Sequence, residues 1–199
     1  MVSKSQRLMR KIPFIVACLL CFSLMTAAPS HAQSTDSSDS SEYLIKAGFT
    51  YNFAKLMEWP SGAFAQPDSP IVIGVLGTDP FNGTLDQVLK GKQANGRAFE
   101  VKHLKWGADL KGCNILFVSD SETAHLDELF HNVKGLPILT IGDTPGFAQR
   151  GGIINFVVED NRVRFEINAD AAKQANINIS SRLLSLAIPV HGTPDGRKP

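Results

Sequence analysis

The stretch that decides the fold is Asn114-Ile115-Leu116-Phe117-Val118, in which four apolar residues follow one another without a break. A strand that is apolar on both faces needs cover on both faces, and such strands are typical of the centre of a parallel sheet. Ile71–Leu76 and residues 137–141 have the same character. These three segments predict a partly parallel sheet with a buried centre.

Helical patterns separate these strands and complete the predicted fold. We expect helices over residues 42–58, 79–90, 122–133, 170–174 and 180–187, and a further strand over residues 98–104. The first helix opens at the capping pair Asp39 and Glu42. Strands over residues 152–159 and 162–168 are joined by the two-residue turn Asp160-Asn161, which predicts a hairpin. The predicted fold class is α/β: a single domain with a mixed, partly parallel sheet and helices on both faces, a Rossmann-like sandwich.

The first 32 residues differ from the rest of the chain. Four basic residues and no acidic one precede an apolar run over residues 12–28, and the small residues of Ser30-His31-Ala32 follow. This pattern is typical of a secretory signal peptide and predicts cleavage near Ala32. An uncleaved membrane anchor is the less favoured alternative, because the run is shorter than the ~20 residues that a spanning helix needs. A lipoprotein processed at Cys18 is another.

The remaining chain divides into a flexible polar leader over residues 33–41, the α/β domain over 42–188 and a flexible tail over 189–199. Without the four basic residues of the signal segment, 16 Lys and Arg stand against 19 Asp and Glu, so the net charge is −3. A mildly acidic domain with scattered basic residues is not typical of nucleic-acid binding. We therefore expect no nucleic-acid partner.

Cysteine usage bears on redox chemistry. Cys18 and Cys21 lie in the predicted signal peptide, so Cys113 alone remains in the exported protein. A single thiol cannot form an internal disulfide. Because Cys113 adjoins an apolar strand, we expect a buried structural thiol; intermolecular pairing stays open as a redox role.

The first predicted helix is apolar around much of its circumference. One stripe contains Ile45, Phe49, Phe53 and Leu56, and another contains Leu44, Ala47, Gly48, Tyr51 and Ala54. One stripe can face the sheet, whereas the other needs a helix, a second subunit or a partner as cover. The alternative is that both stripes are internal.

The predicted hairpin also has two faces. Its core face contains Ile154, Phe156, Val158, Val163, Phe165 and Ile167, and its polar face contains Asn155, Arg162, Arg164, Glu166 and Asn168. The two-residue turn places Asn155 opposite Glu166 and Val157 opposite Arg164. On an open face these polar groups are solvated. Under a cover, they would be paired with one another or would bind an anionic or zwitterionic ligand, with Arg164 as its anchor.

Acidic residues follow three apolar segments closely, at Asp79, Asp120 and Asp143. Ligands gather at the carboxyl ends of parallel strands, so these carboxylates could hold a metal ion. Their positions are also those of helix caps and turns, which is the favoured interpretation. The sequence lacks dinucleotide-binding, P-loop, zinc-protease and serine-hydrolase motifs. We therefore expect a protein that is not an enzyme and has no cofactor and no metal.

Seven segments resemble, in order, the YfiR family of periplasmic regulators. The first is Lys46-Ala-Gly-Phe-Thr-Tyr-Asn-Phe-Ala-Lys-Leu-Met-Glu-Trp-Pro60, and another is Leu139-Thr-Ile-Gly-Asp-Thr-Pro-Gly-Phe147. The others lie at residues 75–81, 112–119, 151–156, 163–168 and 179–184. Together they cover about residues 42–188. Each is short, and the order of all seven makes the resemblance specific.

The resemblance implies a function. Such proteins repress a membrane-bound diguanylate cyclase by binding its periplasmic domain, which limits cyclic di-GMP, exopolysaccharide and biofilm formation. It also implies an α/β sandwich that can form a homodimer. For the partner contact we expect Tyr51, Phe53 and Trp59 of the first helix, together with the polar face of the hairpin. Relatives use paired cysteines, which this chain lacks in its exported part.

Two alternatives stay open. One is a periplasmic small-molecule sensor whose ligand contacts Asn155, Arg164, Glu166 and Asn168. The other is a metal-dependent enzyme that uses Asp79, Asp120 and Asp143.

Overall fold

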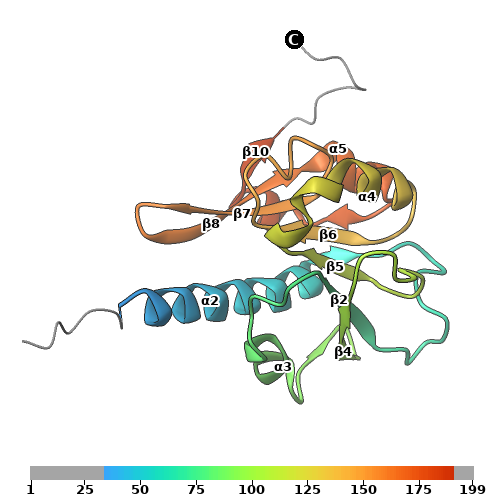
Figure 1. The fold of residues 1–199 in the computed structure, drawn as a ribbon. Helices are drawn as coiled ribbons and strands as arrows, with labels where there is room; N and C mark the ends of the chain where they lie inside the picture. The colour runs from blue at the N-terminus through green and yellow to red at the C-terminus, as the bar shows by residue number, and fades with distance from the viewer. Residues whose placement is uncertain (1–33, 191–199) are drawn as a thin grey trace, which may run out of the picture. The chain divides into compact units, whose positions relative to one another are not determined.

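An eight-stranded sheet is the centre of the structure, a computed structural model that describes residues 34–190 (Figure 1). The strand order is β10-β8-β7-β6-β5-β2-β4-β3. The strands are β2 (Ile71–Leu76), β3 (Gln93–Ala94), β4 (Arg97–Leu104), β5 (Ile115–Val118), β6 (Leu139–Gly142), β7 (Ile154–Glu159), β8 (Arg162–Asn168) and β10 (Ile188–Val190). The predicted signal peptide and its cleavage near Ala32 lie outside the described residues.

The sheet is mainly parallel. β2 pairs with β4 and β5, β5 pairs with β6, and β6 pairs with β7, all in parallel. β10 is parallel to β8, whereas β3–β4 and the β7–β8 hairpin are antiparallel. The apolar strand β5 lies between β2 and β6, as its sequence predicts. A separate pair joins β1 (Met57–Glu58) to β9 (Asn178–Ile179).

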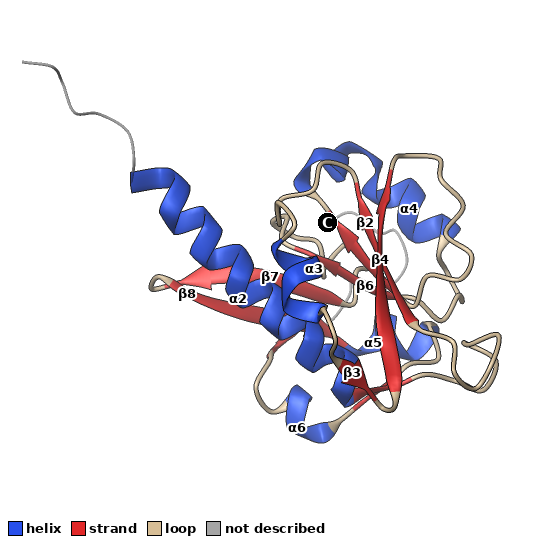
Figure 2. Ribbon diagram, turned by 90° about the horizontal axis from the view of Figure 1, so that it is seen from below, coloured by secondary structure: helices blue, strands red, loops and turns tan. Residues whose placement is uncertain are grey.

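Helices cover both faces of this sheet (Figure 2). The helices are α2 (Ser34–Leu56), α3 (Thr84–Leu89), the 3-10 helix η1 (Asp120–His125), α4 (Leu126–Asn132), α5 (Ala169–Gln174) and α6 (Ser181–Leu184). Alternate residues of β5 serve the two cores: Ile115 and Phe117 face the core that includes α2 and α3, whereas Leu116 and Val118 face α4. The predicted fold class, an α/β sandwich with helices on both faces, is confirmed.

The ends of several elements differ from prediction. α2 starts at Ser34, so residues 34–41 are helical where the sequence predicts a flexible leader. Extending a packed helix by one residue costs less than starting one, which explains the longer helix. α3 starts only at Thr84, because the preceding residues form a turn in which Asp79 accepts the backbone N–H of Phe81. At the other end, Pro189 and Val190 pair with β8 in β10 and do not belong to the predicted tail.

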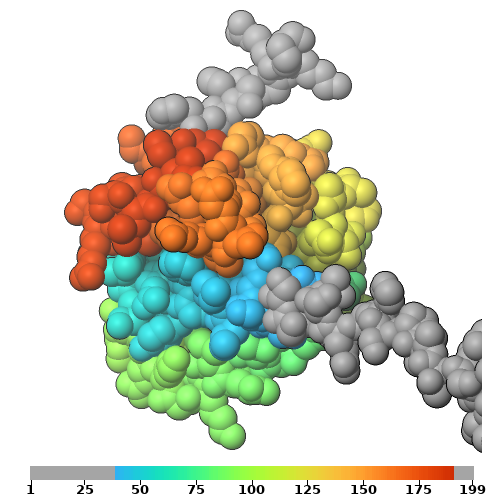
Figure 3. Space-filling model, turned by 90° about the vertical axis from the view of Figure 1, so that its left-hand side faces the viewer, coloured from blue at the N-terminus to red at the C-terminus, as the bar shows by residue number. Residues whose placement is uncertain are grey.

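Helix α2 uses both of its apolar stripes. Phe49 and Phe53 pack on Phe156 and Phe165 of the hairpin, with ring centroids 5.0–6.1 Å apart. On another side of the helix, the Tyr51 ring packs against Phe99 of β4. Figure 3 shows the helix as a band between the C-terminal half of the domain and the segment that contains α3. The interpretation that both stripes are internal therefore holds for this part of the helix.

No helix in the described part of the chain is long and apolar enough to cross a membrane.

The aromatic contact between α2 and the hairpin generates a stability prediction. Phe53 is completely buried, so Phe53→Ala should lower the free energy of unfolding by about 3–5 kcal/mol, because it removes the ring and leaves a cavity. Urea unfolding measures this loss. The matched control is Leu186→Ala, at an exposed apolar side chain, which should change stability by less than about 0.5 kcal/mol. Equal losses in the two variants would contradict the assigned packing.

Candidate functional site

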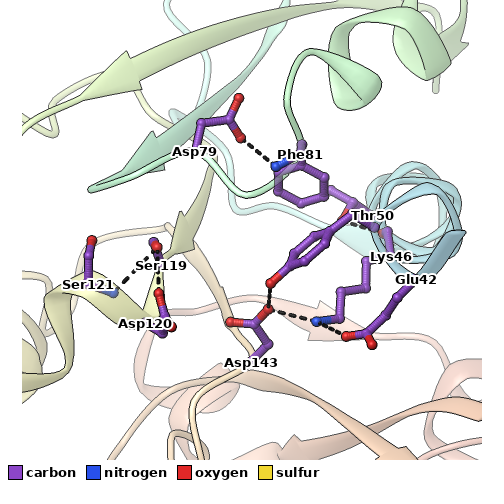
Figure 4. A network of polar contacts seen from close by, with 10 residues as sticks. Glu42, Lys46, Thr50, Asp79, Phe81, Ser119, Asp120, Ser121 and Asp143 are labelled. Carbon is purple, nitrogen blue, oxygen red and sulfur yellow. Dashed lines mark hydrogen bonds and ion pairs between the residues drawn. The ribbon is translucent and has the colours of Figure 1, made fainter. Parts of the chain in front are cut away.

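A buried polar network joins the middle turns of α2 to the carboxyl end of the parallel strands (Figure 4). Lys46 Nζ lies 2.7 Å from Asp143 Oδ2, directly after β6, and 2.6 Å from Glu42 Oε1, one helical turn earlier. The Tyr43 hydroxyl donates to the same Asp143 oxygen over 2.8 Å. The Lys46 and Asp143 side chains are only 4% and 7% exposed. The network therefore connects the helix to the sheet through a pair shielded from solvent.

The electrostatics of this network keep the Tyr43 hydroxyl protonated. Burial raises the pKa of Tyr43 far above its ordinary value, and the negative charge of Asp143 raises it further. Tyr43 thus stays a hydrogen-bond donor at physiological pH. A buried ion pair contributes little net stability, but removal of one partner leaves a buried charge without compensation. The pair therefore specifies the position of α2 more than it adds to stability.

The three aspartates that the metal-dependent alternative would bring together at this edge serve local roles. The Asp143 carboxylate accepts hydrogen bonds from Lys46 and Tyr43. Asp79 accepts the Phe81 N–H, and Asp120 accepts the Ser119 hydroxyl over 3.2 Å. Among the described residues, no group of three or more His, Cys, Asp or Glu side chains is arranged to hold a metal ion. The ligand set of the metal-dependent alternative is therefore not formed.

A groove of about 370 Å³ opens beside the network, between α2, the segment after β6 and the hairpin. Its lining contains Glu42, Lys46, Asp143, Pro145, Gly146, Asn155, Phe156, Val157, Val158 and Glu166. The predicted hairpin register is confirmed, with Asn155 opposite Glu166 and Val157 opposite Arg164. Asn155 Nδ2 donates to Glu166 Oε2 over 2.9 Å. The groove thus combines carboxylates, one amide and an apolar wall.

The four residues predicted to bind a ligand do not form one site. Asn155 and Glu166 share the groove, but Arg164 is half exposed and pairs with Glu159 at 2.7 Å. Asn168 is buried, where its Nδ2 donates to the Ala148 carbonyl and its Oδ1 accepts the N–H of Ala171 at the start of α5. The structure therefore gives Arg164 no role as an anchor in the groove.

The predicted contact residues of the first helix lie deeper than expected. Phe53 has no exposed surface to offer a partner, because the hairpin aromatics cover it. Tyr51 and Trp59 are partly buried, against Phe99 and Phe64 respectively. These side chains mainly complete the core of the domain.

Three apolar side chains of α2 and the hairpin that the sequence did not single out as contacts are exposed. They are Leu44 (52%), Ile45 (46%) and Val158 (51%), here called the α2–hairpin surface. Val158 was predicted to be in the core. It is exposed because β7 pairs with β6 only at Ile154 and Asn155, so the hairpin tip projects beyond the sheet. For Leu44 and Ile45, the only sequence feature that could have indicated exposure is that they are the first residues of the two apolar stripes.

Geometry places Ile45 and Val158 on the same side of the helix–hairpin contact. Ile45 lies one turn before Phe49, and Val158 lies two residues beyond Phe156 on the same strand face. A helical turn and two strand residues advance about 5–7 Å each, so both side chains extend the aromatic contact in one direction. Figures 1 and 2 show the first half of α2 beside the hairpin. The α2–hairpin surface therefore borders the groove, of which Val158 is also a wall.

Cys113 is buried next to β5, as the sequence predicts. Burial raises the pKa of its thiol above the ordinary value. A thiol that is both shielded and protonated reacts slowly with another sulfur.

Comparison with known proteins identifies the domain. The sequence model of the YfiR/HmsC-like family matches residues 43–188, which confirms the resemblance found in the ordered segments. A search of curated proteins found no match.

The buried network yields a prediction for Lys46. Lys46→Met should destabilise the protein by about 3–5 kcal/mol, because Asp143 then stays buried without its cation. Lys55→Met, at an exposed position of the same helix, should cost no more than about 1 kcal/mol, since its ammonium contributes only an exposed contact with the Tyr51 ring. Thermal or urea unfolding at neutral pH compares them. A loss of similar size at both positions would rule out a special role for the buried pair.

Cys113 yields a prediction for thiol chemistry. A chain that begins at Gln33 has Cys113 as its only cysteine. At pH 8 a thiol-specific reagent should label the native protein about tenfold or more slowly than the urea-unfolded protein, because the native thiol is covered and its pKa is raised. As the pH is raised from 8 to 9, the Cys113 thiol loses its proton in the unfolded chain before it does so in the native protein. Labelling of the unfolded chain therefore accelerates first. Equal rates in the two states would show that Cys113 is accessible.

Proposed function

Since the chain belongs to the YfiR/HmsC-like family, we propose that it is a periplasmic regulatory protein that binds and represses a membrane-anchored diguanylate cyclase. Export by the predicted signal peptide brings it to the periplasm. There it binds the cyclase's periplasmic domain and holds the cytoplasmic catalytic domain inactive. Cyclic di-GMP then stays low, and exopolysaccharide and biofilm formation stay limited.

The observation that supports a binding function is the α2–hairpin surface. Leu44 and Ile45 are neighbours on α2, Val158 lies on the hairpin, and each of the three is about half exposed. Exposed apolar side chains that gather on elements held in place are typical of an interaction surface. Here the helix is held by Lys46 and Asp143 on one side and by the hairpin aromatics on another. We therefore place the cyclase contact at Leu44, Ile45 and Val158, with Tyr51 and Trp59 farther along.

Repression follows from unequal affinity for two states of the cyclase. A ligand shifts a conformational equilibrium only if it binds one state more tightly than the other. Moving a cyclase from 1% to 99% inactive requires about a 10⁴-fold preference for the inactive form. A preformed contact surface supports such a preference, because little conformational entropy is lost on binding. Release of the regulator returns the cyclase to its active state.

This proposal predicts that Ile45→Asp weakens binding to the full-length cyclase by about tenfold or more, because a carboxylate would be buried in an apolar contact. The cyclase is sought among neighbouring genes as a membrane protein with a periplasmic domain. Its binding to the regulator is measured by biolayer interferometry with the solubilised enzyme. Cyclase activity should be higher with the Ile45→Asp variant than with the wild-type regulator.

The matched control is Leu186→Asp, which introduces the same charge at an exposed apolar position after α6. Its affinity should stay within twofold of the wild type. Unchanged binding by Ile45→Asp, with an unchanged melting temperature, would exclude the α2–hairpin surface as the contact.

A further inference from the structure

We infer that the partner places a cationic side chain, an arginine guanidinium or a lysine ammonium, in the groove between α2 and the hairpin. This inference rests on the proposed function and adds the chemistry of the group recognised. The groove adjoins the α2–hairpin surface and shares Val158 with it. A partner that covers Val158 therefore also contacts one wall of the groove.

The charge of the groove favours a cation. Its lining carries three carboxylates, Glu42, Asp143 and Glu166, and one ammonium, Lys46. Lys46 is committed to Asp143 and Glu42. Glu166 is held by neutral amides alone: Asn155 Nδ2 at 2.9 Å and Gln149 Nε2 at 3.2 Å. Within the described residues 34–190 it forms no ion pair, so its negative charge is uncompensated.

Asn155 provides an independent observation. Its side chain is 1% exposed, and its Oδ1 is buried without a hydrogen-bond partner. The amide cannot be reversed, since a carboxylate only accepts hydrogen bonds and Nδ2 must therefore face Glu166. A buried acceptor left unpaired costs about 1–3 kcal/mol. The carbonyl oxygen of this amide, on a residue that lines the groove, therefore lacks a hydrogen-bond donor.

A guanidinium or an ammonium meets both requirements. Either group brings several N–H donors together with a positive charge, so it can serve the Glu166 carboxylate and the Asn155 carbonyl at once. The aliphatic part of the same side chain would lie along the apolar wall of Phe156, Val157 and Val158. A cleft of about 370 Å³ accommodates one such side chain. An anion would instead meet a lining with an excess of carboxylates.

The test compares two carboxylates of the same hairpin. Glu166→Gln removes the charge in the groove and keeps the shape of the side chain. Glu159→Gln removes an exposed charge that pairs with Arg164 outside the groove. Affinity for the solubilised full-length cyclase should fall tenfold or more for Glu166→Gln and stay within twofold for Glu159→Gln. The affinity of Glu166→Gln should also depend less on salt than that of the wild type.

A charge exchange identifies the partner residue. Each exposed Arg and Lys of the cyclase's periplasmic domain is replaced by Glu and measured against the wild type and Glu166→Lys. One exchange should restore at least part of the binding lost in Glu166→Lys. Equal losses in Glu166→Gln and Glu159→Gln would overturn the inference, because they indicate a general charge effect.

The inference and the proposed function can fail separately. If Ile45→Asp abolishes binding but Glu166→Gln does not weaken it, the surface docks and the groove holds only water. That result would overturn the inference alone. If neither variant weakens binding, the surface assigned to the partner fails as well. Melting temperatures of both variants establish that the fold is retained.

Discussion

The buried pair of Lys46 and Asp143 is the interaction on which the arrangement of the domain depends. It joins a helix near the start of the domain to the end of a central strand about a hundred residues later in the chain. Neither charge has an alternative in solvent, so the helix cannot rotate or slide without exposing an uncompensated charge to a low-dielectric interior. Tyr43 reinforces this restraint by donating to the same carboxylate. The polar network thus determines the orientation of α2, whereas apolar packing contributes most of the free energy of folding.

Apolar packing explains why the exposed surface lies where it does. The helix lies against the hairpin aromatics in its middle, where the ring contacts bury Phe53 completely and Phe49 in part. Beyond those rings, the helix and the hairpin both continue while the parallel strands do not. Their last apolar side chains consequently have no third layer to cover them. An exposed apolar surface arises from this difference in length.

The sequence alone predicts those features that depend on local patterns. The apolar run at residues 115–118 predicts a central strand, and Asp160-Asn161 predicts the register that brings Asn155 opposite Glu166. The core position of Val158 was predicted wrongly, and Phe53, expected at a partner contact, is completely buried, because burial depends on which distant element ends where. No local signal shows that β7 leaves its neighbour after Asn155, or that β10 pairs with β8. The buried pair was also missed, since Lys46 resembles any solvated lysine of an amphipathic helix.

The projecting hairpin has open strand edges as well as an exposed apolar surface. Within the part of the chain that the structure describes, residues 156–159 and 162–165 pair only with each other, so the outer edge of each strand keeps open main-chain groups. Such edges invite a strand from another molecule and so favour aggregation. Glu159, Arg162 and Arg164 stand at this tip, and charged side chains on an edge discourage uncontrolled strand addition. The same charges therefore disfavour aggregation through the projecting apolar hairpin.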